Sequence, residues 1–159
     1  MSQRRRSRAG EDAQSLVETA LVLPFLIVLV LGFAGAILAL DAITELRAAT
    51  GLATSSAFSA PYGATGQALH NISDTFQRSV HGAFFVPGSL RITCPPSDGN
   101  QYLYSSTYQP NTVVSCHGSA TLSFSNSLIG LVWQWNVTLQ QDAQLAVPPF
   151  RQCATGVTC

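Results

Sequence analysis

The residue with the clearest potential for chemistry is Glu18, a carboxylate at the start of a long apolar stretch. Between Glu18 and Asp41 the chain has no charged residue. An ionisable group at the centre of a bilayer costs roughly 2.5–3.5 kcal/mol on insertion scales, so such a group usually faces protein or has a partner. We expect Glu18 to pair with a charge on another subunit. The alternative is a position at the membrane surface, where its side chain reaches water at little cost.

The four cysteines are the second group of residues whose side chains could react or bind a metal. Four cysteines allow three disulfide connectivities, and in an exported domain disulfides are the expected state. We expect Cys94 to pair with Cys116, which joins two adjacent predicted strands, and Cys153 to pair with Cys159, which closes a short terminal loop. A zinc site using Cys116, His117 and another cysteine pair is the alternative. Because no C-x-x-C spacing occurs, we expect no metal and no other cofactor.

A catalytic set is not visible in the sequence. Catalysis needs a nucleophile with its base, paired carboxylates or a metal set. The histidines His70, His81 and His117 have no motif partners, the carboxylates are scattered, and no glycine-rich phosphate loop is present. We therefore expect a structural or binding protein rather than an enzyme. A formal net charge of +0 gives no argument for nucleic-acid binding.

The apolar stretch is long enough to span a membrane. About 20 residues at a rise of 1.5 Å cover the roughly 30 Å hydrocarbon core. We expect a long helix over residues 14–60, with a transmembrane segment at about residues 18–40. Four of the eight basic residues precede this segment: Arg4, Arg5, Arg6 and Arg8. The positive-inside rule keeps such a flank in the cytoplasm, so the rest of the chain is exported.

A secretory signal peptide is the competing interpretation of the same stretch. A basic head, an apolar run and Ala34-Gly35-Ala36 imitate its three regions. However, the run is longer than a usual signal core, and apolar residues continue beyond it at helical spacing: Ile43, Leu46, Ala49, Leu52, Ala53 and Ala57. The pattern favours a helix that is retained.

Several residues of this helix bear on its packing. Pro24 removes a backbone donor, and it either kinks the helix or is an ordinary transmembrane proline. Two pairs of small residues, Gly32 with Ala36 and Gly35 with Ala39, would let another helix approach closely.

The segment Gln14-Ser15-Leu16-Val17-Glu18-Thr19-Ala20-Leu21-Val22-Leu23-Pro24 resembles the N-terminal signature of the TadE-like proteins. These are minor pilins or pseudopilins of bacterial tight-adherence (Flp-type) pilus systems, which are related to type IV pili. The basic leader, the valine before the glutamate, the Ala-Leu-Val-Leu-Pro run and the alanine-rich helix occur in the family's order. A weaker likeness covers 127–131 and the alternating segment 137–147, which is similar to the family's closing strand region.

The resemblance implies that a prepilin peptidase cuts on the cytoplasmic side, between Ala13 and Gln14. The cut would remove a basic leader over residues 1–13 and make Glu18 the fifth residue of the mature chain. The family usually has Gly before the cut, and here Gly10 is the nearest; a cut there would leave two acids at the new terminus, so we prefer Ala13. The new α-amino group of one subunit could then pair with Glu18 of a neighbour in a low-dielectric setting. Glu18 and Pro24 are thus the expected assembly residues, and other pilins or pseudopilins and the assembly platform are the expected partners.

Turn formers at residues 61–66 mark the start of an exported domain over 61–159. Apolar spacing predicts a short helix over 67–80, and strand patterns occur at 84–86, 89–94, 112–117, 119–124 and 135–147. The connection between Cys94 and Cys116 looks like a variable hairpin excursion. The fold class is therefore α+β with an antiparallel sheet. Trp133 and Trp135 would share one face of a strand, where they form either a patch for a partner subunit or part of the core.

Two functions fit these patterns. The first is a minor pilin or pseudopilin that is inserted by its N-terminal helix, processed, and used in a pilus or a related secretion apparatus. The second is an uncleaved, single-pass envelope protein whose disulfide-stapled domain binds a ligand or partner. In both, the N-terminus is cytoplasmic and the C-terminal domain lies outside the cell membrane; the resemblance adds a surface filament as its destination. The two functions differ at Ala13 and Glu18.

Overall fold

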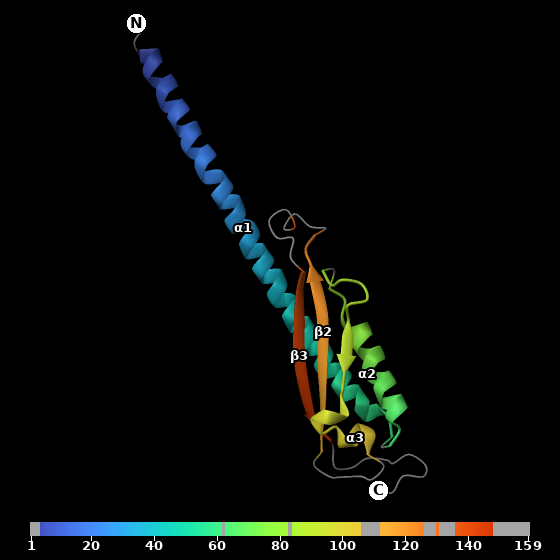
Figure 1. Cartoon of the computed structure of the whole chain (residues 1–159). Helices are drawn as coiled ribbons and strands as arrows, with labels where there is room; N and C mark the ends of the chain where they lie inside the picture. The colour runs from blue at the N-terminus through green and yellow to red at the C-terminus, as the bar shows by residue number, and fades with distance from the viewer. Residues whose placement is uncertain are drawn as a thin grey trace.

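The computed structural model describes residues 4–61, 63–82, 84–105, 112–125, 130 and 136–147, with side chains from Leu16 onward. The helices are α1 (Arg4–Ser56), α2 (Thr65–Ser79) and α3 (Gln101–Tyr104), with the short 3₁₀ turns η1 (Ala57–Ser59) and η2 (Pro96–Asp98). The strands are β1 (Arg91–Thr93), β2 (Val113–Ser123) and β3 (Asn136–Ala146). We call residues 4–40 of α1 the stalk, and the described residues of 63–147 the head. Figure 1 shows the head folded against the second half of α1, with the stalk extending beyond it.

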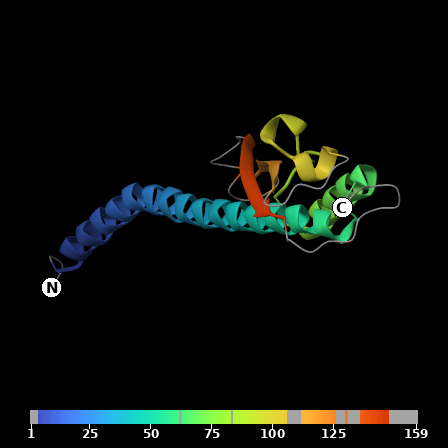
Figure 2. The same ribbon diagram turned by 90° about the horizontal axis from the view of Figure 1, so that it is seen from below.

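The long helix is the dominant element of the fold. In the described part of the chain, Leu16–Ser59 is the one segment long and apolar enough to cross a membrane, by length and composition. Pro24 is the proline inside α1. A proline lacks the N–H that would bond the carbonyl four residues earlier and its ring crowds that carbonyl, so it bends a helix. Figure 2 shows α1 bent in its N-terminal part, where Pro24 lies.

The sheet is antiparallel with the order β1-β2-β3. The pairing of β2 with β3 runs from Val113↔Ala146 to Ser123↔Asn136, and β1 adds three residues on the other edge of β2. The expected α+β fold, with its long helix, antiparallel sheet and short helices, is confirmed. The predicted strand at 84–86 is reduced to a single bridge, Phe85↔Leu122.

The two predicted strands at 112–117 and 119–124 are in fact one strand, β2, which passes through Gly118. The glycine is needed for close packing rather than for a turn. A Cβ at Gly118 would lie 2.3 Å from Thr50 Oγ1 and 3.1 Å from a ring carbon of Phe76. Glycine inside a strand often marks such a close approach of another element. It therefore lets α1 and α2 lie close under the centre of the sheet.

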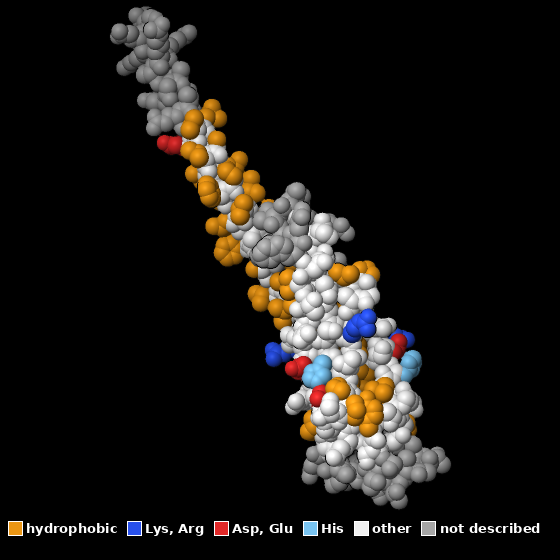
Figure 3. Space-filling view, in the orientation of Figure 1, with side chains coloured by type: hydrophobic (Ala, Val, Ile, Leu, Met, Phe, Trp, Pro, Cys, Tyr) orange, Lys and Arg blue, Asp and Glu red, His pale blue; other side chains and the backbone are white. Residues whose placement is uncertain are grey.

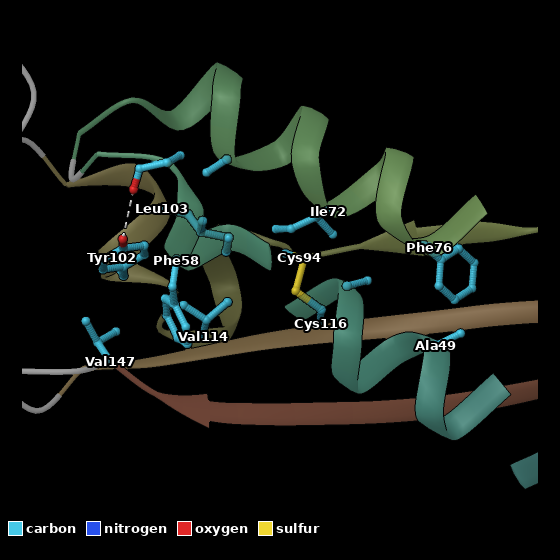
Figure 4. Packing of buried hydrophobic residues seen from close by; sticks show 14 of the residues in the cluster. Ala49, Phe58, Ile72, Phe76, Cys94, Tyr102, Leu103, Val114, Cys116 and Val147 are labelled. Carbon is cyan, nitrogen blue, oxygen red and sulfur yellow. Dashed lines mark hydrogen bonds between the residues drawn. A yellow bond between two sulfur atoms is a disulfide. The ribbon is translucent and has the colours of Figure 1, made fainter. Parts of the chain in front are cut away.

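The core lies between the sheet and the two helices. Small residues, including Ala49 and Ala53 of α1, are buried against the head, and Ile72 and Phe76 of α2 fill the space beside them (Figure 4). The alanines bring the α1 backbone close to its neighbours. This packing fixes the direction in which the stalk leaves the head.

Two threonines of α1 are buried in the same interface. Thr50 and Thr54 donate their hydroxyl hydrogens to the carbonyls of Leu46 and Thr50, each at 2.7 Å. A buried hydroxyl without a partner would be costly, and a bond to the carbonyl four residues earlier avoids this cost. Both threonine hydroxyls are thus buried without losing a hydrogen-bond partner.

The connection between Cys94 and Cys116 joins the antiparallel neighbours β1 and β2, as a hairpin connection does, but its described part is folded rather than extended. Residues 95–105 form η2 and α3, and the side chains of Tyr102 and Leu103 are buried. The amide of Asn100 donates to the carbonyls of Pro95 and Ser115, both at 2.8 Å, and accepts the Ser115 N–H at 2.6 Å. The side chain of Asn100 therefore forms hydrogen bonds with the β2 backbone at Ser115, as a neighbouring strand would.

The predicted pairing of Cys94 with Cys116 is confirmed. Their S–S distance is 2.02 Å, and the bond joins the residue that follows β1 to the middle of β2. Both cysteines are buried beside the helices (Figure 4). The predicted pair of Cys153 and Cys159 lies outside the described residues.

Candidate functional site

The stalk exposes a continuous apolar surface. From Leu16 onward most of its large apolar side chains are between half and about three quarters exposed, for example Leu26 at 51% and Phe25 at 77%, whereas Leu31 and Leu38 are half-buried. Figure 3 shows these side chains around the stalk, whereas the head is largely covered by polar and backbone atoms. Soluble monomers rarely expose so large an apolar surface, which marks contact with a membrane or with other proteins. This surface is the candidate functional site.

Glu18 lies within this apolar surface. It lines a shallow hollow on the helix together with Thr19, Val22, Leu23 and Leu26. Among the side chains that the structure describes, Glu18 makes no ion pair. A carboxylate on one face of the stalk, bordered by aliphatic side chains, is placed to meet a cation from another molecule or from the membrane surface.

The structure separates the two predicted pairs of small residues. Gly35 is buried, Ala39 is half-buried, and the neighbouring Leu38 packs against the head. By contrast, no described side chain lies within 4 Å of a Cβ added at Gly32, and Ala36 is exposed. The pair Gly32 and Ala36 thus remains open to a second helix, while Gly35 already serves packing within the chain.

The remaining predicted site residues have no described side chains. Ala13 and Gln14 belong to the helical backbone of α1, and their side chains fall outside the described set. The predicted partner patch of Trp133 and Trp135 also lies outside the described residues.

A cluster that the sequence did not reveal lies on the outer face of the sheet. The Nδ1 of His117 lies 2.7 Å from a carboxylate oxygen of Asp142, and its Nε2 is hydrogen-bonded to Asp98. The sequence shows no motif partner for this histidine, and the fold supplies two carboxylates from distant segments. The hydrogen bond with Asp142, followed by that with Asp98, raises the pKa of His117. Asp142 stands opposite His117 in the β2–β3 register, which the sequence spacing alone does not give.

The cluster is suited to holding elements together. It links η2, β2 and β3 through one imidazole whose two nitrogens are both bonded to carboxylates. Within the described residues, no group of three or more His, Cys, Asp or Glu side chains is arranged to hold a metal ion. The geometry therefore supports a structural contact at the surface.

A second contact missed from the sequence fixes the head to α1. Glu45 accepts the backbone N–H groups of His81 and Gly82, at 2.5 and 3.0 Å. A Cβ at Gly82 would lie 2.8 Å from the other carboxylate oxygen of Glu45 and 2.7 Å from the ring of Phe85. These contacts hold the turn after α2 against α1, close to the C-terminal end of the stalk.

The chain was also compared with protein-family models, with curated proteins and with solved structures, and no match was found.

Proposed function

We propose that this protein is a minor pilin or pseudopilin-like structural subunit. It is inserted in the membrane by α1 and takes part in assembly of a tight-adherence type pilus or a related secretion apparatus. One observation carries the proposal: within the single helix α1, residues 16–30 are exposed and mostly apolar, while the C-terminal part is built into the core of a disulfide-bonded head. This arrangement is consistent with a pilin-like fold, in which the same helix serves as membrane anchor and as assembly surface.

The burial of Gly35 supports a retained helix over a cleaved signal peptide. The segment 34–36, which imitates a signal-peptide cleavage region, lies inside α1. Ala34 and Leu38 pack against the cluster formed by Ala42, Leu122 and Phe124. A cut after Ala36 would remove residues that the head already uses.

In this function the apolar stalk lies in the membrane and the head lies outside. A disulfide between Cys94 and Cys116 agrees with an oxidising compartment for the head, where such bonds persist. A prepilin peptidase cuts between Ala13 and Gln14, and Glu18 pairs with the new α-amino group of a neighbouring subunit. The open pair of Gly32 and Ala36 then gives a second helix room to pack against the stalk.

The test is to replace Glu18 and follow insertion and assembly separately. Glu18→Ala should leave the protein in the membrane fraction and remove it from the filament or pseudopilus fraction. Asp74→Ala is the matched control, because it also removes a carboxylate but only breaks an exposed pair with Arg78 on the head. Normal assembly of Glu18→Ala would refute the proposed role of this carboxylate.

A second candidate function is an uncleaved, membrane-anchored protein whose head binds a ligand or partner. It is favoured by an open groove of about 450 Å³ between α2 and β1. The groove is lined mainly by apolar side chains: Leu69, Ile72, Ile92, Pro95 and Tyr104 among them. A volume of this size falls within the range of small-molecule sites, roughly 300–1,000 Å³. In this case Glu18→Ala would have no effect on function, and the bond between Ala13 and Gln14 would stay uncut.

A further inference from the structure

The hydrogen bonds of β2 show which of its residues bond toward the β1 edge. Because β3 occupies the other edge along the whole length of β2, the segment before β1 lies on this edge. There the Thr121 carbonyl accepts the Val86 N–H at 2.8 Å, and the Ser123 N–H donates to the Phe84 carbonyl at 2.9 Å. The backbone groups of successive strand residues point alternately to the two sides. The odd-numbered residues of β2 therefore bond toward β1.

Ile92, the middle residue of β1, has its backbone groups on the open side of the strand. The residues on either side of Ile92 stand opposite Ser119 and His117, which are odd-numbered and bond toward β1. Ile92 itself stands opposite Gly118, so its N–H and C=O point away from β2. None of the residues that the structure describes forms a hydrogen bond with either group. Unpaired groups on an edge strand are a template for another strand.

The open side of β1 is one wall of the groove of about 450 Å³ described above. The helix α2 is the other wall, and Figure 1 shows it beside β1, the yellow-green strand. Leu69, Ile72 and Ser73 line the groove from α2, and Pro95 and Tyr104 line it beyond the end of β1. The described lining residues carry no charge. The groove therefore combines apolar walls with one open stretch of backbone.

The segment after β1 holds the groove in shape. The Tyr104 hydroxyl donates to the Cys94 carbonyl at 2.8 Å, and the Asn100 amide donates to the Pro95 carbonyl at 2.8 Å. The disulfide to Cys116 fixes Cys94 against β2. A wall that is already ordered costs little conformational entropy on binding. Tyr104 also occupies the carbonyl of Cys94, so a ligand strand would pair before this point.

The chemistry of the groove selects an extended peptide as its occupant. A charged ligand finds no opposite charge in the described lining. An acyl chain fills the apolar space but leaves the N–H and C=O of Ile92 buried without partners, which is costly. A peptide strand pairs with both groups, and its alternate side chains reach Leu69 and Ile72. Such strand addition takes its affinity from backbone bonds and its specificity from side-chain pockets.

We propose that the groove between α2 and β1 binds an extended, uncharged peptide segment of a partner protein, added as a strand beside Ile92. The inference rests on the groove that favours the second candidate function. It needs neither processing at Ala13 nor pairing of Glu18. The assembly test with Glu18→Ala and the binding test below therefore succeed or fail separately.

The experiment is an NMR titration of the full chain, with its disulfide intact, in lipid nanodiscs. The probes are capped pentapeptides in which threonine alternates with valine, leucine, isoleucine or phenylalanine. Each has a control peptide with the same side chains and every inner amide N-methylated, which cannot donate as a strand does. Ser73→Trp fills the groove from an exposed position of α2, and Gln77→Trp, exposed on α2 outside the lining, is the matched control.

We expect at least one probe to shift the amide signal of Ile92 and to slow its hydrogen exchange. N-methylation should weaken binding about 2- to 10-fold for each hydrogen bond lost. Ser73→Trp should weaken binding at least as much, and Gln77→Trp should bind like the parent chain.

Two results would overturn the inference. The first is that no probe shifts the Ile92 signal at millimolar concentration. The second is equal binding of a probe and its N-methylated control, because the groove would then take an apolar group without strand pairing. This second comparison uses the parent chain alone, so it holds even if Ser73→Trp fails to fold.

Discussion

Replacing Gly118 with alanine is expected to destabilise the head by about 2 kcal/mol, because the centre of the sheet has no room for one more methyl group. The added Cβ would lie 2.3 Å from Thr50 Oγ1, 3.2 Å from Thr50 Cγ2 and 3.1 Å from a ring carbon of Phe76. Thr50 cannot turn aside cheaply, since its hydroxyl is bonded to the Leu46 carbonyl at 2.7 Å.

The magnitude follows from three contributions. Forcing an extra methyl into a packed core costs about 1–3 kcal/mol. Pushing Thr50 off its rotamer adds about 0.5–1.5 kcal/mol. Alanine restricts the unfolded chain more than glycine does, which offsets about 0.4–1 kcal/mol of this destabilisation. The balance is a loss of about 2 kcal/mol.

The assay is urea unfolding of the full chain in detergent micelles, followed by near-ultraviolet circular dichroism with the disulfide intact. Gly118→Ala should lower the midpoint at an unchanged slope. In a Thr50→Ala background the same substitution should cost about 1–2 kcal/mol less, because the nearest atoms have been removed. Thr54→Ala is the matched control: it removes the same kind of buried threonine, with the same hydroxyl bond, about one turn along α1.

Two results would refute the reasoning. The first is a Gly118→Ala variant as stable as the parent chain. The second is a Gly118→Ala penalty that is equal in the Thr50→Ala and Thr54→Ala backgrounds, because Thr50 would then not be the obstacle.

Three further predictions concern the contacts that hold the head together. Replacing Cys94 and Cys116 with alanine opens a loop of 22 residues and should lower stability by about 3 kcal/mol in the same unfolding assay; an unchanged midpoint would contradict it. Asn100→Ala leaves buried backbone groups of β2 unpaired and should cost about 2–3 kcal/mol, whereas a loss below measurement error would show that water replaces the amide. For His117 the pKa lies above its ordinary value of 6.5, so its contribution to stability is complete below pH 6.5 and is lost as pH rises through the raised pKa. The advantage of the parent chain over Asp142→Asn should therefore shrink on going from acid to alkaline pH, and an NMR titration that places the pKa of His117 at or below 6.5 would oppose this.

The helical half of the fold could be predicted because its signals are local. An apolar run bounded by Glu18 and Asp41, followed by apolar residues at helical spacing, specifies one long helix from sequence alone. The end of the helix could also be predicted, because the turn formers begin at Pro61, two residues after the end of η1. The pairing of Cys94 with Cys116 followed from their places on adjacent predicted strands.

The features that were missed depend on contacts between distant segments. In the sequence, Gly118 looks the same whether it ends a strand or lets a helix approach closely. Only the position of Thr50 on α1 distinguishes the two cases. The partners of His117 depend on the β2–β3 register and on the fold of η2. Asn100 lies in a segment rich in turn residues, so its role as a substitute strand partner could not be read from composition.

The same reasoning explains why only part of the candidate site was predicted. The sequence identified Glu18 and the small residues of the stalk. It did not distinguish the open pair, Gly32 and Ala36, from the buried Gly35, because that difference depends on where the head packs along α1.

The most direct test of the proposed function is the intact mass and N-terminal sequence of the protein recovered from its native membranes, with the prepilin peptidase present and absent. The account predicts a chain that starts at Gln14 only when the peptidase is present. A chain that keeps Arg4 to Arg8 in both cases would contradict pilin-type processing and favour the uncleaved anchor. A chain that starts after Ala36 would mean a secreted protein and would contradict both membrane functions.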